Sequence, residues 1–410
     1  MGWHLLEPHV TAPRLAYVVA EYPKVSHTFV AREVAALRAA GATIDTVTIR
    51  RTPETGLLSE EDRRAAAETF AVLPAAPAAL LRAHARWGRR GPRRYVRTLA
   101  QAVRLGAPGL RNRLWQLFYF AEAGLLADEL HRRGTEHVHA HFATVGSAVA
   151  LLAARLLGKP WSFTMHGPLE FDAVERYAIA DKVRDAAFVA CISDFCRAQL
   201  MRLVEPAHWD KLHIVHCGLE PERYAAPARE VRDVVELLAI GRLEPMKGFA
   251  VLIDAVAALV REGEPVRLTI VGDGPQRAAL EARARGLPVT FTGALGAPAV
   301  TERLRAADVF CLASFAEGVP VVLMEAMASG LPVVTTQIMG VPELVDDGES
   351  GLLVAPGRPE PFADALRRVV REPDLRARLG RAGQAKVAAE FDVRTAAGVL
   401  QRLFAEAAQR

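Results

Sequence analysis

Short apolar runs alternate with amphipathic segments along the chain, and this alternation occurs in two series. The first series has an apolar run at 14–20, then a segment at 29–37 whose apolar residues follow the helical period, then an apolar run at 43–50. A strand, a helix and a second strand in this order form a βαβ unit, which is typical of a parallel sheet. The pattern therefore predicts an α/β protein.

The second series begins after a segment that is rich in proline and in mixed charge. The charged run 229–233 indicates a linker, and the apolar run 234–240 restarts the βαβ alternation. A chain of 410 residues is long enough to bury two cores. We therefore predict two doubly wound, Rossmann-like domains that face each other across a cleft, at residues 1–225 and 226–395, followed by a terminal helix at 396–410.

A turn, a helix start and two carboxylates come together at residues 314–330, directly after a predicted strand. Gly318 allows a ligand to approach the backbone closely, and Pro320 suits the first position of a helix. The positive end of this helix, at Val319 to Val322, can bind a diphosphate. Glu317 and Glu325 are too far apart along the helix to be an acid/base pair, but they can lie at either end of an elongated ligand. The alternative is an amphipathic helix that Glu317 caps, although Glu325 would then need a partner inside an apolar run.

A second candidate loop follows the first strand of the second domain. The sequence Gly-Arg-Leu-Glu-Pro-Met-Lys-Gly at 241–248 places two cations and two glycines between a strand and a helix, which suits a diphosphate. The alternative is that Arg242 and Lys247 are ordinary surface residues. Another strand ends in Gly272-Asp-Gly274, but Arg277 stands where a dinucleotide fingerprint needs its third glycine.

These two stretches carry a family resemblance that extends over nearly the whole chain. The frame Glu-Gly-x-Pro-x-x-x-x-Glu at 317–325, together with 241–248, resembles the retaining nucleotide-sugar glycosyltransferases of family four, which have the GT-B fold. The resemblance implies that Glu325 binds the ribose of the donor, that Glu317 contacts its sugar, and that Arg242 and Lys247 bind its diphosphate. Gly272, Gly318, Val319 and Val321 are further expected donor-binding residues, and the terminal helix is expected to cross back to the first domain.

Histidines mark the end of two predicted strands in the first domain. His166 directly follows the strand 161–165, at the edge where ligands gather in open α/β sheets, and family members have a histidine here that contacts the donor sugar. His137, His139 and His141 alternate along another strand and share one face. No carboxylate or cysteine completes a metal site and the strand is expected to be buried between helices, so we expect His139 and His141 to hydrogen-bond at the end of the sheet. The motifs also contain no Asp-x-Asp pair, so we expect no metal at the donor diphosphate and count Glu317, His166, Arg242 and Lys247 as the reactive set.

A long basic stretch precedes these histidines. Ten arginines lie between Arg82 and Arg113, and no Asp or Glu occurs from Ala71 to Ala121. The stretch is predicted to be helical, and three interpretations remain open: a solvated face, a surface for anionic lipid in which Trp87 and Tyr95 suit the interface, and a site for a phosphorylated acceptor. Nucleic acid is not expected, because no recognition motif accompanies the arginines.

Composition limits the compartment and the class of function. The four cysteines form neither a disulfide framework nor a zinc pattern, and neither a signal peptide nor a long apolar span is present, so we expect a cytoplasmic protein, with contact at the inner face of a membrane as an option. The motifs favour a transferase that uses UDP-sugar, or next GDP-sugar, and an acceptor that is a glycan, a lipid-linked molecule or a small molecule. Short features such as His-Ala-His-Phe at 139–142 resemble members that build exopolysaccharide or colanic-acid-type chains. A nucleotide-sugar epimerase of the same fold and an inactive nucleotide-sugar-binding subunit are the rival functions.

Overall fold

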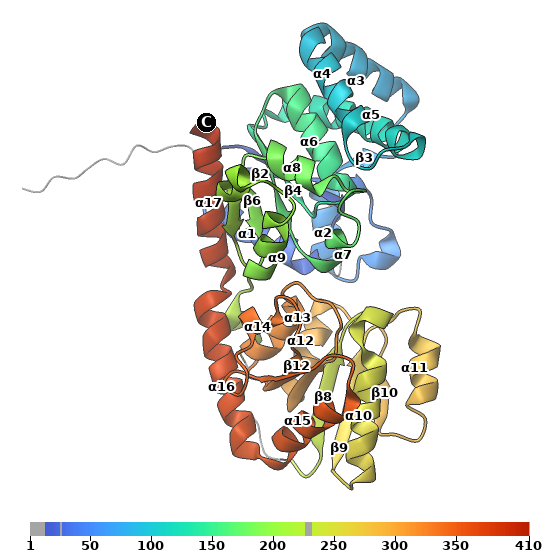
Figure 1. The fold of residues 1–410 in the computed structure, drawn as a ribbon, viewed down its shortest axis with the longest axis vertical. Helices are drawn as coiled ribbons and strands as arrows, with labels where there is room; N and C mark the ends of the chain where they lie inside the picture. Colours follow the sequence, from blue (N-terminus) through green and yellow to red (C-terminus); the bar gives the residue numbers. More distant parts are fainter. Residues whose placement is uncertain (1–12, 25–26, 226–231, 410) are drawn as a thin grey trace, which may run out of the picture.

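Two parallel sheets, each flanked by helices, form the protein (Figure 1). The computed structural model describes residues 13–24, 27–225 and 232–409. The first sheet has seven strands in the order β3-β2-β1-β4-β5-β6-β7, and all of its pairings are parallel. Its strands are β1 (Leu15–Glu21), β2 (Ile44–Arg50), β3 (Phe70–Leu73), β4 (His137–His141), β5 (Trp161–Met165), β6 (Val189–Cys191) and β7 (Leu212–Ile214).

The second sheet has six strands in the order β10-β9-β8-β11-β12-β13, and it is also wholly parallel. Because helices cover both faces of such a sheet, its strands are continuous apolar runs rather than alternating ones. β11, with the sequence Val-Phe-Cys-Leu, is buried throughout. The strands are β8 (Val235–Ile240), β9 (Val266–Val271), β10 (Val289–Phe291), β11 (Val309–Leu312), β12 (Val333–Thr336) and β13 (Leu352–Val354). This architecture confirms the predicted fold class.

Helices connect the strands of each sheet. In the N-terminal domain they are α1 (Thr28–Ala39), α2 (Glu60–Glu68), α3 (Pro77–Arg90), α4 (Pro92–Arg104), α5 (Leu110–Arg133), α6 (Val145–Leu157), α7 (Pro168–Phe171), α8 (Ile179–Asp185) and α9 (Asp194–Met201). In the C-terminal domain they are α10 (Phe249–Arg261), α11 (Arg277–Arg283), α12 (Ala297–Ala306), α13 (Val321–Ala328), α14 (Val341–Leu344) and α15 (Pro359–Arg371). Short 3₁₀ turns lie at Glu54–Gly56, Pro206–Lys211, Pro221–Tyr224 and Pro245–Lys247.

The last two helices run along one side of both domains (Figure 1). They are α16 (Pro373–Glu390) and α17 (Val393–Gln409). Leu400 and Phe404 of α17 share a buried cluster with Tyr17 of β1 and Val34 of α1. The end of the chain is therefore part of the N-terminal core, and it ties the two domains together.

Helices α3, α4 and α5 group at the end of the N-terminal domain that lies away from the C-terminal domain (Figure 1). The basic stretch, which the sequence predicts to be helical, forms α3, α4 and the first turns of α5, which begins at Leu110. Helix α2 and strand β3 were not predicted, since neither carries a clear apolar period. Within the described residues no helix is long and apolar enough to cross a bilayer.

Candidate active site

The loop between β11 and α13 places Glu317 inside the protein, with its carboxylate bonded to two partners. Lys247 Nζ lies 2.6 Å and Ser314 Oγ 2.7 Å from Glu317 Oε1, and the glutamate is 8% exposed. The partners make this burial tolerable, because a buried carboxylate without them would be costly. Helix α13 starts at Val321 with Pro320 as its N-cap, so the proline lies one position earlier than predicted. The N–H groups of Val321 and Val322 lie in the first turn, where a helix has no internal acceptor for them.

Gly318 has a second role that the sequence did not reveal. A Cβ on Gly318 would lie 2.3 Å from the carbonyl oxygen of His166, in the other domain, and a Cβ on Gly340 would lie 2.4 Å from the carbonyl oxygen of Gly318. The two domains therefore meet backbone to backbone at this loop. A side chain at 318 would force them apart.

The loop at 241–248 separates its two cations. Lys247 contacts Glu317, whereas Arg242 forms an ion pair with Glu244 at 2.6 Å and its side chain is 64% exposed. Gly248 has φ +63°, and its Cβ would collide with the carbonyl oxygen of Ala313, so glycine is needed where the two loops cross. Gly272 packs against this loop, since a Cβ added to Gly272 would lie 1.9 Å from the carbonyl oxygen of Gly241. The contact gives Gly272 a supporting position beside the loop.

Glu325 has the partners that its apolar surroundings require, and they come from the N-terminal part of the chain. Its Oε1 accepts a hydrogen bond from Arg32 Nη2 at 2.6 Å and from the Tyr224 hydroxyl at 2.9 Å. Burial, and then the negative charge of Glu325, raise the pKa of Tyr224, so that its hydroxyl stays protonated and donates. Sequence reasoning missed both partners, because Arg32 is one charge on an amphipathic helix and Tyr224 lies in a 3₁₀ turn near the linker.

His166 faces this loop from the end of β5. Its ring packs against Phe29 and Phe142, with ring centroids 4.6 and 4.5 Å away. Its Nε2 lies 2.9 Å from His141 Nδ1, and its backbone N–H donates to Glu170. Burial lowers the pKa of His166 well below its usual value, so the ring is neutral near pH 7.

The three alternating histidines are buried, as predicted, and two of them hydrogen-bond within the sheet. Ser162 Oγ lies 2.7 Å from both His137 Nε2 and His139 Nδ1, and Thr164 Oγ1 lies 2.9 Å from His139 Nε2. The statement that no carboxylate completes the set was wrong, because Glu33 of α1 reaches to 3.3 Å from His141 Nε2. Both ring nitrogens of His139 already have hydrogen-bond partners, and Glu33 accepts from the Tyr17 hydroxyl at 2.8 Å. The group is thus part of a buried hydrogen-bond network.

A second carboxylate joins the domains on the other side of the Gly318 loop. Glu343, in α14, accepts hydrogen bonds from the backbone N–H groups of Asp194 and Phe195 at 2.7 and 2.8 Å. These groups form the start of α9, where negative charge is favourable.

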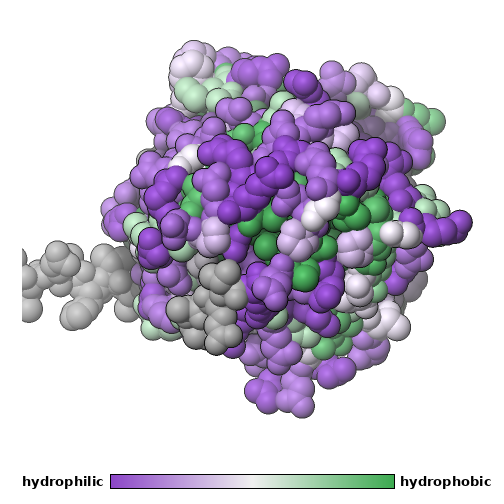
Figure 2. All heavy atoms as spheres, turned by 90° about the horizontal axis from the view of Figure 1, so that it is seen from below, coloured by the Kyte–Doolittle hydropathy of each residue, from purple (hydrophilic) through white to green (hydrophobic). Residues whose placement is uncertain are grey.

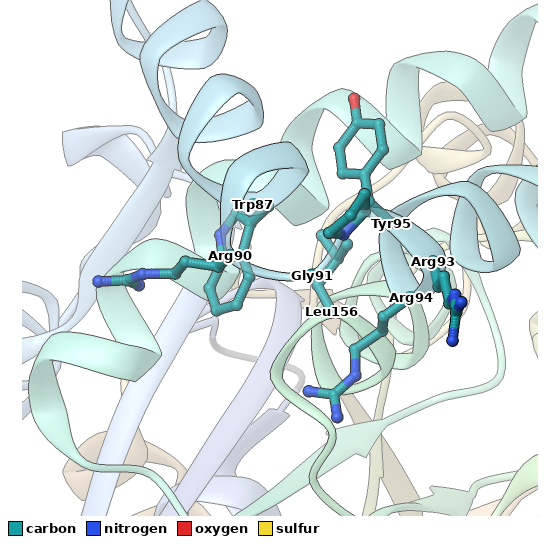
Figure 3. A pocket seen from close by; sticks show the side chains of 8 residues that line it. Trp87, Arg90, Gly91, Arg93, Arg94, Tyr95 and Leu156 are labelled. Carbon is teal, nitrogen blue, oxygen red and sulfur yellow. The ribbon is translucent and has the colours of Figure 1, made fainter.

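A surface cavity of about 390 Å³ lies away from this site, at the turn between α3 and α4 (Figure 3). Trp87, Tyr95 and the arginines 90, 93 and 94 line it. The site itself is narrow in this closed arrangement, because Gly318 lies directly against His166. The candidate active site is therefore identified by converging side chains rather than by an open hollow.

Comparison with known proteins gives the same answer for both domains. A family model described as Glycosyltransferase Family 4 matches residues 27–223, and one described as Glycosyl transferases group 1 matches residues 235–372. An alpha-D-kanosaminyltransferase of Streptomyces kanamyceticus is 29% identical over 68% of this chain and 79% of its own length. A D-inositol 3-phosphate glycosyltransferase of Streptomyces scabiei is 31% identical over 66% of this chain and 68% of its own length.

Solved structures agree on the fold. A sucrose-phosphate synthase from Thermosynechococcus elongatus superposes with a TM-score of 0.74 at 20% identity, over 96% of this chain and 98% of that one. HepE of Anabaena, solved with UDP and glucose, superposes with a TM-score of 0.71 at 18% identity, over 95% and 98% of the two chains. The site geometry, the two family models and these structures lead to one conclusion: the chain belongs to the family-4 glycosyltransferases of the GT-B fold.

Proposed function

We propose that this glycosyltransferase moves a hexosyl group, with retention at the anomeric carbon, from a UDP-sugar to a hydroxyl of its acceptor; GDP-sugar is the next candidate donor. The observation that carries the proposal is the pair Lys247–Glu317, held beside the start of α13 and opposite His166. A cation and free helix N–H groups suit a diphosphate. A carboxylate next to them suits a sugar hydroxyl.

Each part of the donor would bind to different side chains of the site. Lys247 and Arg242 would bind the diphosphate, together with the backbone N–H of Val319 and the first N–H groups of α13, at Val321 and Val322. Glu325 would bind the ribose hydroxyls after exchanging its contact with Arg32, and Glu317 and His166 would contact the sugar. As the bond between the anomeric carbon and the phosphate oxygen breaks, the electron pair leaves with the diphosphate, and the acceptor oxygen attacks on the same face. A donor phosphate oxygen then takes the acceptor proton.

The acceptor would bind on the N-terminal side, where the wall is made of neutral rings. His166, His27 and Phe142 offer hydrogen bonds and apolar area but no charge near pH 7. Such a wall suits a polyhydroxylated acceptor. The names of two relatives, a kanosaminyltransferase and a 2-deoxystreptamine glucosyltransferase, support a saccharide or cyclitol, while glycan and lipid-linked acceptors keep their place beside these small molecules.

Thermal shift of the purified chain with UDP, GDP and dTDP-sugars tests the donor. We expect UDP-sugars to raise the unfolding temperature most. The preferred donor is then incubated with cyclitol, saccharide and lipid-linked acceptors, and product is followed by mass spectrometry. An epimerised sugar or rapid release of free UDP without acceptor would favour the epimerase, and donor binding without any turnover would favour the inactive subunit.

A further inference from the structure

Exposed apolar side chains concentrate in one stretch of the chain. Among the residues that the structure describes, thirteen large apolar side chains are exposed, and seven of them lie within residues 81–118. They are Leu81, Val96, Leu110, Leu114, Trp115, Leu117 and Phe118. By contrast, hydrophilic side chains cover most of the opposite end of the molecule, at the C-terminal domain, with apolar groups between them (Figure 2). Five of the seven lie in the first nine residues of α5, and these five are called the apolar cluster.

At the start of α5 the usual distribution of side chains is reversed, because polar side chains are buried and apolar ones are exposed. A helix on a protein surface normally turns its apolar side chains inward. Here Gln116 is 3% exposed and Asn112 bonds inward to the carbonyl of Leu105 at 2.8 Å, whereas Leu110 is 75% and Phe118 59% exposed. Leucines at 110, 114 and 117 repeat along the outer side with the helical period. This outer side lacks a partner within the described chain, so it needs an apolar one from outside.

The charged residues of the stretch 82–113 are all basic. Of the ten arginines between Arg82 and Arg113, Arg86 alone forms an ion pair with a carboxylate of the described residues, that of Asp128. Arg104, Arg111 and Arg113 are exposed beside the apolar cluster. A symmetric contact with a second copy would bring these arginines face to face, which is unfavourable. An anionic surface attracts them instead.

The aromatic residues that the sequence suggested for an interface line the cavity between α3 and α4, and they are less exposed than the aromatic rings of α5. Trp87 is only 7% exposed and packs against His131, and the Tyr95 hydroxyl bonds to His84. Trp115 and Phe118, at 46% and 59% exposed, take that place. Amphipathic rings of this kind suit the boundary between lipid headgroups and acyl chains.

We propose that the exposed start of α5, with Leu81 of α3 and the flanking arginines, docks the enzyme on an anionic lipid bilayer. Leu114, Trp115 and Phe118 enter the interfacial layer, and Arg104, Arg111 and Arg113 bind lipid phosphates. The proposal concerns a surface and does not depend on the transfer reaction.

Co-sedimentation with vesicles tests the proposal without any substrate. We expect binding to vesicles of phosphatidylglycerol and phosphatidylcholine, at least tenfold weaker binding to phosphatidylcholine alone, and weakening with added salt. Leu114→Gln with Phe118→Gln should reduce binding at least tenfold, and Arg104→Gln with Arg111→Gln and Arg113→Gln should do the same. The unfolding temperature of each variant is measured to show that it folds.

Matched controls keep the test specific. Trp209→Gln with Leu58→Gln changes exposed apolar residues elsewhere, and the triple change of Arg303, Arg358 and Arg381 to Gln removes the same charge from the C-terminal domain; both should bind vesicles like the wild type. Three results would overturn the proposal: equal binding to neutral and anionic vesicles, no effect of the Leu114 and Phe118 changes, or a stable dimer in solution that these changes dissociate. The last result would assign the face to a second copy.

Discussion

The two walls of the active site differ in charge. The C-terminal wall carries Lys247, Glu317 and Glu325, each of which is ion-paired in the protein without donor. The N-terminal wall carries His27, His141 and His166 among phenylalanine rings, with Arg32 as the cation that crosses from it to Glu325. The C-terminal wall thus carries paired charges, one of them paired with a cation of the other wall, and the N-terminal wall carries few charges.

This difference suits a reaction in which charge develops on one side only. The departing nucleotide becomes more negative, and the preorganised cation Lys247 stabilises that charge without reorganising water. The acceptor and the sugar stay close to neutral, so hydrogen bonds from neutral groups are enough on the other side. Substitutions that move or remove charge should therefore act strongly on the C-terminal wall and weakly on the N-terminal one.

The largest effect is expected for Glu317. Glu317→Ala should lower kcat by about 100- to 1,000-fold with a much smaller change in the Kd for UDP, because the contact to the sugar matters most in the transition state. Single-turnover kinetics and calorimetry measure the two quantities. Glu317→Gln is the control, since it keeps the volume and tests the charge. A variant that loses UDP affinity but keeps its turnover would place Glu317 on the phosphate side.

Lys247 is expected to act mainly on donor binding. Lys247→Ala should raise the Kd for UDP by about 10- to 100-fold, the range for losing a charged hydrogen bond in a partly buried site. Arg242→Ala is the matched comparison: Arg242 is exposed and paired with Glu244, so its removal should cost less. If both changes raise the Kd for UDP equally, Arg242 must exchange its ion pair with Glu244 for a contact with the diphosphate when the donor binds.

Glu325 is expected to have a smaller effect that requires a partner variant to interpret. Glu325→Ala should raise the Kd for UDP about tenfold if the carboxylate of Glu325 binds the ribose. Arg32→Met removes the ion pair and leaves Glu325 with its bond from the Tyr224 hydroxyl, so it should leave UDP binding unchanged or tighter. Calorimetry on both variants separates the alternatives. Equal weakening by the two changes would show that Glu325 acts by holding the domains together.

The neutral histidines of the N-terminal domain should affect how the free energy of unfolding depends on pH. Burial lowers the pKa of His27 to about 4 and of His137 to about 3, from 6.5, so these rings bind protons only after unfolding in the window between. The free energy of unfolding should therefore fall as the pH drops from about 6.5 toward 4, by at most about 1.4 kcal/mol per pH unit for each ring.

A variant isolates this contribution. Burial also raises the pKa of Glu122 and Glu170 to about 7, and these two acids favour the folded state as the pH falls from 7 to 4.5, which opposes the histidines. Denaturant titrations of the wild type and of His27→Gln should thus be compared at each pH. The variant should lose less stability between pH 6.5 and 4, while His208→Gln at the surface should follow the wild type. Parallel curves for wild type and His27→Gln would contradict the neutral wall.

The sequence predicted one wall better than the other for a physical reason. Gly318, Glu317 and Lys247 lie in short loops whose glycines, proline and charges leave a local signal, and the βαβ alternation placed those loops at strand ends. Arg32, Tyr224 and Glu33 reach the site only through tertiary packing. Arg32 lies 293 residues and Tyr224 101 residues from Glu325 in the sequence, and Glu33 is similarly distant from His141. A single charge or hydroxyl on an otherwise ordinary helix or turn gives no local pattern. The exposed leucines of α5 were missed similarly, because an apolar period shows that a helix has a face and not which way that face points.

The smallest effect is expected from removing metal ions. Neither candidate loop contains an Asp-x-Asp pair, and the cations Lys247 and Arg242 can meet the charge of the diphosphate. Transfer should keep its rate in excess EDTA, measured on protein that has been dialysed against chelator and analysed for bound metal. The comparison of the two walls sharpens this test. Among the described residues, metal-ligating atoms come together at Glu33, His139 and His141. This group lies on the N-terminal wall and not beside the expected diphosphate site. Loss of activity in EDTA that magnesium or manganese restores would mean that a metal ion shares the diphosphate with Lys247, and the charged wall would then need a cation that the chain does not supply.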